Sequence, residues 1–264
     1  MSTETLQNLE ICVRSLEELL PSLTDEQWEA QSLCPDWTVR EVITHLAGVE
    51  HMLTEWKPQS AEEPLPFEKL AASVAEFAAR TEGASGAELV DRWRSIMDIR
   101  RTQWAAMTVE DLDRECMTPV GPATYGRFMA IRVFDHWVHE QDIRRPLGIP
   151  GHETGPAAEM SIDEIQGSLG YIAGKKIGLP DGTSMTISLT GPVTRTMHVA
   201  VDGRARVVPA LDHPDVTLTS DSTTFALLAC GRIDPSAEIE AGRISWSGDD
   251  EWGERAARNL AFTM

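Results

Sequence analysis

Phe134-Asp-His-Trp-Val-His-Glu-Gln-Asp142 lies near the end of a long predicted helix. Residues four apart on a helix stand one above the other, so Asp135 pairs with His139, and His136 pairs with Glu140. Either carboxylate–imidazole pair can hold one metal ion, and zinc is suited at ligand distances of about 2.0–2.2 Å. The apolar neighbours favour Asp135 and His139 only slightly, so the spacing leaves both pairs open. The alternative of a solvated helix end is weakened by the apolar residues within the segment.

Three other long helices are predicted before this one, because apolar residues recur at steps of three and four. Thr38-Val-Arg-Glu41 fits a capping box at the start of the second. We expect the four helices to form a bundle. They span about residues 5–20, 38–56, 88–106 and 124–144.

The pattern changes after about residue 150, where short alternating segments replace the helical periodicity. Asp202-Gly203 between two such segments is a strong hairpin signal. Ser161-Ile-Asp-Glu164 fits a capping box that would open a helix. The predicted fold class is therefore α+β with two domains: a four-helix bundle over residues 1–150, and a smaller α+β domain with an antiparallel sheet over residues 151–264.

The charge balance excludes several partners. The chain of 264 residues has 23 Lys and Arg against 42 Asp and Glu, a net charge of −19 spread over its whole length. Nucleic acids and anionic membrane surfaces need basic patches, so neither is an expected partner. The acidic start does not resemble a signal peptide, and the four cysteines form no CxxC pair. We expect a cytoplasmic protein that is a monomer or a homodimer.

His45 offers a third metal ligand. It shares a helical face with Val42, Val49 and Met52, so its side chain is expected to point inward. Taken alone, an inward histidine is more simply a hydrogen-bonded core residue. Together with the later acid–histidine pair, however, it would complete a site with three protein ligands and an open position for water or substrate.

Two stretches resemble the mycothiol-dependent maleylpyruvate isomerase family, whose N-terminal domain is a DinB-like metal-binding bundle. They are Cys34-Pro-Asp-Trp-Thr-Val-Arg-Glu-Val-Ile-Thr-His-Leu-Ala-Gly48 and Arg132-Val-Phe-Asp-His-Trp-Val-His-Glu-Gln-Asp-Ile-Arg-Arg145. The C-terminal part resembles the family's second domain, which is similar to sterol carrier proteins. Its matching stretches are Asp215-Val-Thr-Leu-Thr-Ser220, Leu227-Leu-Ala-Cys-Gly-Arg232 and Ile244-Ser-Trp-Ser-Gly-Asp249.

The resemblance implies a divalent metal, usually zinc, held by His45, Asp135 and His139. The isomerase that gives the family its name has Glu where this chain has Asp135, and the side chain of Asp is one methylene shorter than that of Glu. The implied cosubstrate is mycothiol, a low-molecular-weight thiol, whose metal-bound thiolate would attack a small electrophile. The expected reaction is S-transfer or cis–trans isomerisation. Arg232 and Arg243 are candidates for binding a substrate carboxylate.

Two other functions remain open at this stage. One is a non-catalytic protein that binds a small ligand and carries a structural metal. The other is a metal-dependent hydrolase that uses bound water as the nucleophile. A fourth protein ligand would favour the structural role, and turnover without any thiol would favour the hydrolase.

Overall fold

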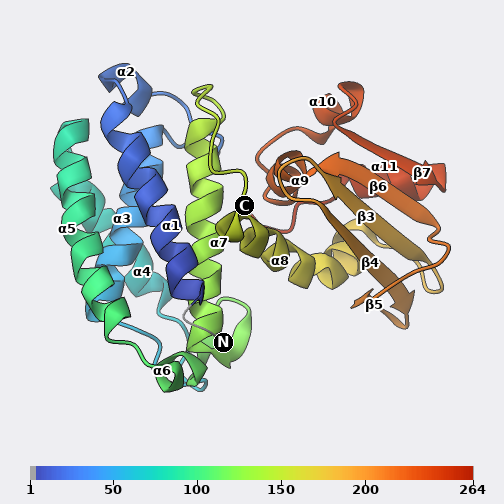
Figure 1. Cartoon of the computed structure of the whole chain (residues 1–264), viewed down its shortest axis with the longest axis horizontal. Helices are drawn as coiled ribbons and strands as arrows, with labels where there is room; N and C mark the ends of the chain where they lie inside the picture. Colours follow the sequence, from blue (N-terminus) through green and yellow to red (C-terminus); the bar gives the residue numbers. More distant parts are fainter. Residues whose placement is uncertain (1–3, 264) are drawn as a thin grey trace. The chain divides into compact units, whose positions relative to one another are not determined.

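The computed structural model describes residues 4–263. The chain divides into two compact units, and the boundary lies between Pro150 and Gly151. Figure 1 shows helices in the first unit, and a sheet with helices in the second. The first unit contains α1 (Glu4–Leu19), α2 (Asp25–Trp28), α3 (Val39–Glu55), α4 (Phe67–Arg80), α5 (Gly86–Ala105), α6 (Val109–Asp113), β1 (Glu115–Thr118), β2 (Gly121–Thr124) and α7 (Tyr125–Arg144), with a 3₁₀ turn at Leu20–Ser22.

Four helices close into a bundle. α1 packs against α7 and α5, and α3 packs against the same two helices. The predicted capping box at Thr38 and Glu41 is present at the start of α3. The bundle core contains large buried side chains such as Trp93 and Trp137. The predicted four-helix bundle is confirmed.

α4 is an additional helix that the sequence did not predict. It packs on α3, outside the four-helix ring, and only Phe77 of its residues is buried. A local signal for it existed, because Phe67, Leu70, Val74 and Phe77 recur at steps of three and four, and the sequence analysis missed it.

A close approach between α3 and α4 depends on Gly48. A Cβ placed on Gly48 would lie 2.8 Å from the Cα of Val74 in α4. We expect Gly48→Ala to lower the free energy of unfolding by about 1–3 kcal/mol, because the backbone of α4 must move away. Urea unfolding followed by circular dichroism measures this.

Gly167 provides the matched control for that substitution. It also lies within a helix, but a Cβ there meets no atom within 4 Å. Gly167→Ala should therefore raise stability by up to about 1 kcal/mol through helix propensity. Equal effects of the two substitutions would contradict the proposed crowding between α3 and α4.

The second unit contains α8 (Pro156–Tyr171), a π-helical turn (Ile172–Ile177), β3 (Ser184–Thr190), β4 (Arg195–Asp202), β5 (Arg204–Val208), β6 (Val216–Asp221), α9 (Ser222–Ala229), α10 (Pro235–Glu240), β7 (Ile244–Gly248) and α11 (Asp250–Arg258). Its five strands have the order β5-β4-β3-β6-β7. The hairpin predicted at Asp202-Gly203 joins β4 to β5, and Gly203 has the positive φ (64°) that a tight hairpin favours.

Two details of this unit differ from the sequence prediction. The pairing of β3 with β6 is parallel, whereas all the other pairs are antiparallel. The β4–β5 hairpin lies between these two strands in the chain and gives the long connection that a parallel pair requires. In addition, Ser161 does not open a helix: α8 already starts at Pro156, and the Ser161 hydroxyl donates to the Ala157 carbonyl one turn earlier.

No helix within residues 4–263 is long and apolar enough to cross a membrane.

Candidate metal centre

The structure brings His45, Asp135 and His139 together inside the first unit. His45 comes from α3, and the other two residues come from α7. One potential ligand atom from each residue lies within 4.8 Å of those of the other two. The two imidazole rings are 5.0 Å apart, and His139 Nε2 lies 3.7 Å from Asp135 Oδ1. Two histidines and one carboxylate are a donor set that suits zinc.

The rival pair has other partners. His136 is fully buried, and its Nδ1 lies 2.8 Å from the carbonyl oxygen of Arg132. Glu140 accepts hydrogen bonds from Ser15 Oγ at 2.6 Å and from Arg144 Nε at 2.5 Å. Neither residue belongs to a group of three metal-ligating side chains among residues 4–263. The geometry therefore separates two pairs that helical spacing could not distinguish.

Asp142 orients His139. Its Oδ2 lies 2.9 Å from His139 Nδ1, and the carboxylate is fully buried. With the proton on Nδ1, the ring donates to Asp142 and leaves the Nε2 lone pair free to bind a cation. A carboxylate behind a ligating histidine commonly fixes its tautomer and raises its basicity.

Burial keeps His45 neutral. Loss of solvent disfavours the charged imidazolium, and this lowers the pKa of His45 from 6.5 to about 4, although the negative charge of Asp135 acts in the opposite direction. Since only the neutral ring can bind a metal, His45 is in a suitable state at pH 7.

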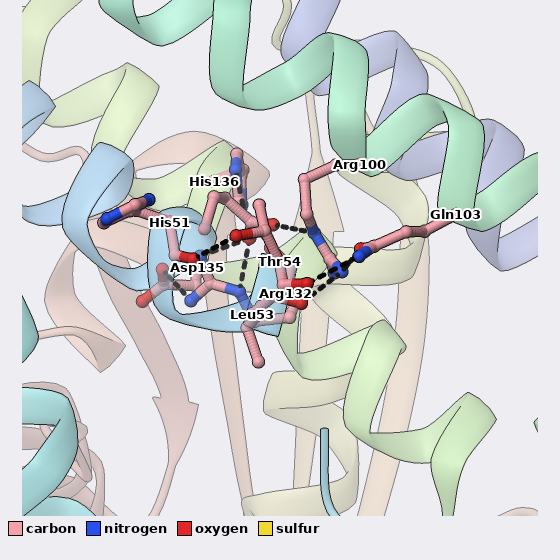
Figure 2. A network of polar contacts seen from close by, with 9 residues as sticks. His51, Leu53, Thr54, Arg100, Gln103, Arg132, Asp135 and His136 are labelled. Carbon is pink, nitrogen blue, oxygen red and sulfur yellow. Dashed lines mark hydrogen bonds and ion pairs between the residues drawn. The ribbon is translucent and has the colours of Figure 1, made fainter. Parts of the chain in front are cut away.

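An ion-pair network that the sequence analysis missed holds Asp135. Arg132 donates from Nη1 to Asp135 Oδ2 at 2.7 Å and from Nε to Glu50 Oε1 at 2.9 Å. Glu50 Oε2 in turn accepts from Arg100 Nε at 2.8 Å. Figure 2 shows Arg100, Arg132 and Asp135 converging on this cluster. The network occupies one oxygen of Asp135 and leaves Oδ1 facing His139.

The charges in this network determine the pKa values of its acids. Burial would raise the pKa of Asp135, but the Arg132 guanidinium and the three neighbouring histidines together hold that pKa well below its usual range. Glu50 behaves in the same way: against the effect of burial, Arg132 and Arg100 lower its pKa from 4.5 to about 2. A sequence signal for Glu50 did exist, because it lies on the same helical face as Leu46 and Leu53, which are buried.

An alternative group shares one residue with this centre. Cys34, His139 and Asp142 also bring one potential ligand atom each within 4.8 Å. It would need Asp142 as a ligand, although that carboxylate is hydrogen-bonded to His139 Nδ1. All four cysteines of the chain are buried free thiols.

A cavity of about 250 Å³ opens beside the centre, and His45, Arg132 and Asp135 form its polar part. The remaining wall comes from α3, α4 and α7 and from the segments that precede α4 and α7. The indole ring of Trp37 lies near both imidazole rings of the centre. Its centroid is 5.1 Å from that of the His45 ring and 6.1 Å from that of the His139 ring.

The two arginines predicted to bind substrate lie in the second unit. Arg243 is exposed and forms a two-pronged ion pair with Glu238. Arg232 is half-buried and donates from Nη1 to the Cys230 carbonyl at 3.1 Å. Their role stays a prediction. Arg243 is the weaker candidate, because a neighbouring carboxylate already offsets its charge.

Comparisons with known proteins match both units. Residues 9–144 match the model of the Mycothiol maleylpyruvate isomerase N-terminal domain, and residues 159–255 match that of the MDMPI C-terminal domain. Two crystal structures, of the mycothiol-dependent maleylpyruvate isomerase and of a histidine-to-alanine mutant of it, are 16% and 15% identical to this chain. Each comparison covers 94% of this chain and 93% of the other, with a TM-score of 0.61. At this identity the likeness shows a shared fold. No curated protein gave a significant match.

Proposed function

This chain belongs to the mycothiol maleylpyruvate isomerase family, a family of enzymes, and on that premise we propose that it is a metal-dependent enzyme that uses mycothiol to attack a small electrophile. The reaction is either a cis–trans isomerisation or an S-transfer. The observation that carries the proposal is the convergence of His45, Asp135 and His139 beside an open cavity.

The side chains of the site supply ligand atoms suited to a divalent cation, and zinc is the proposed ion. His45 and His139 supply nitrogen donors, Asp135 supplies a negative oxygen, and Asp142 fixes the ring of His139. A bound zinc ion would lower the pKa of a coordinating thiol and so supply a thiolate at neutral pH.

The isomerase and transferase reactions differ in what happens after the sulfur attacks. In isomerisation, the thiol sulfur adds to one carbon of a C=C bond, the resulting single bond rotates, and elimination restores both the double bond and the thiol. In S-transfer by displacement, the S–C bond forms as the leaving group departs with its electron pair. Both begin with the same nucleophile, so one site serves either reaction.

Mass spectrometry together with NMR tests the proposal. The zinc-loaded protein, mycothiol and a panel of electrophiles that includes maleylpyruvate are incubated, with chelated protein as the control. Thiol adducts, or trans isomers observed by NMR, should form only with zinc-loaded protein and mycothiol. Turnover that is equal with and without the thiol would overturn the proposal in favour of a hydrolase.

Asp142 gives a separate prediction about metal affinity. Asp142→Ala is expected to weaken zinc binding by about 10–100-fold, since the orienting partner of His139 is lost. Asp142→Asn should recover part of this loss, because the amide oxygen still accepts a hydrogen bond from Nδ1. Competition with a chromophoric chelator at pH 7 measures both affinities. If Asp142→Ala binds zinc as tightly as the parent protein, Asp142 does not orient the ligand.

A further inference from the structure

The wall of the cavity beside the candidate metal centre is almost entirely apolar. Apart from His45, Arg132 and Asp135, all eleven residues that line it are hydrophobic or proline. They include the indole of Trp56, the ring of Phe128 and the aliphatic side chains of Ile131 and Leu70.

The one cationic side chain in this wall is already paired. Arg132 donates hydrogen bonds to Glu50 from Nε and to Asp135 from Nη1, and its buried Nη2 lies 2.8 Å from Glu50 Oε1 without a hydrogen bond, so two carboxylates offset its charge. A substrate carboxylate placed against this wall, away from the metal position, would therefore lose its water and gain no unpaired side-chain cation in return. Burial of an unpaired charge is strongly unfavourable.

The sugar part of a thiol such as mycothiol is equally unsuited to this wall. Each hydroxyl placed against apolar side chains would lose a hydrogen bond to water without replacement. The cavity volume of about 250 Å³ exceeds the roughly 150 Å³ of an engineered apolar cavity that holds benzene. One substituted aromatic ring therefore fits.

We infer that this cavity binds the body of an uncharged, apolar electrophile of about the size of one substituted aromatic ring. The inference rests on the proposed function for the reaction itself, but the binding preference follows from the wall alone. It selects against a diacid such as maleylpyruvate as the substrate of this chain.

Calorimetry with a matched pair of unreactive probes tests the binding preference without any thiol. The probes are 4-nitrotoluene and 4-nitrobenzenesulfonate, which share a nitrophenyl ring and differ in charge; a sulfonate coordinates metals only weakly. The zinc-loaded protein should bind the uncharged probe at least about tenfold more tightly, since desolvating an unpaired anion costs more than about 1.4 kcal/mol.

Substitutions at Leu70 show whether the cavity is responsible. This side chain is half-buried in α4 and lines the cavity. Leu70→Arg should reverse the preference by adding an unpaired cation, whereas Leu70→Gln should weaken binding of the uncharged probe without favouring the anion. Equal or tighter binding of the sulfonate by the parent protein, or no change in the preference with Leu70→Arg, would overturn the inference.

A second arm separates this inference from the proposed function. Turnover with mycothiol is compared for two aryl chlorides that are identical except for one carboxylate. A higher kcat/KM for the uncharged chloride supports the inference, and a higher kcat/KM for the carboxylate overturns it. If neither chloride nor any other electrophile reacts while the probe preference holds, the proposed function fails and the binding inference stands.

Discussion

Simultaneous replacement of His45, Asp135 and His139 by Ala is expected to abolish zinc binding, from about one ion per chain in the parent protein to a background level. The three side chains are the protein ligands of the proposed site, and their ligand atoms lie within 4.8 Å of one another. Plasma mass spectrometry on gel-filtered protein measures the zinc content, and circular dichroism verifies that the helices remain.

The control must show that zinc is not lost whenever any histidine and carboxylate are removed from this acidic protein. His51→Ala combined with Glu55→Ala removes one histidine and one carboxylate from the same helix, outside the centre. This double variant should keep about one zinc ion. Unchanged zinc in the folded triple variant would place the metal elsewhere.

Single substitutions distinguish the two overlapping groups of ligands. If His45, Asp135 and His139 hold the ion, His45→Ala lowers the zinc affinity and Cys34→Ala leaves it unchanged. If Cys34, His139 and Asp142 hold it, Cys34→Ala lowers the zinc affinity and His45→Ala leaves it unchanged.

Glu50→Ala is expected to lower the free energy of unfolding by about 3–5 kcal/mol. The substitution leaves Arg100 and Arg132 buried, with side chains 1% and 9% exposed, without the carboxylate that pairs with both. Removal of one partner of a buried ion pair costs far more than the pair contributes, because the remaining charge stays out of water.

Urea unfolding at pH 7 measures this loss. The pKa of Glu50 is lowered to about 2, so its stabilising effect is complete above about pH 4.5 and disappears as the pH falls toward 2. Glu76→Ala is the matched control, because it also removes a carboxylate from an ion pair with an arginine, Arg80, but on an exposed surface. It should change stability by less than about 1 kcal/mol. A similarly small loss for Glu50→Ala would contradict the network.

Local sequence signals predicted the four bundle helices and the hairpin because each depends on neighbouring residues. Thr38 and Glu41 are three residues apart, and Asp202-Gly203 lies directly between its two strands. α4 was missed although Phe67, Leu70, Val74 and Phe77 are spaced as on an amphipathic helix. The true start of α8 escaped because Ser161 forms a hydrogen bond within the helix instead of capping it.

The candidate site was only partly accessible from the sequence, since its decisive contacts are long-range. Helical spacing produced two acid–histidine pairs of nearly equal merit, and only the position of His45 on another helix separates them. The link between Glu50 and Arg132 spans 82 positions. The ion pair between Arg132 and Asp135, by contrast, joins residues three apart on one helix, so local spacing offered a signal that the sequence analysis missed.

The four buried cysteines acquire a meaning from the proposed reaction. An enzyme that binds the cell's small thiol is exposed to the oxidised form of that thiol, which forms mixed disulfides with accessible sulfur atoms. Exchange requires a protein thiolate that can reach the disulfide, and burial raises the pKa of the thiols of Cys12 and Cys116. Because all four thiols are buried, exchange with such a disulfide would first require local opening of the folded chain.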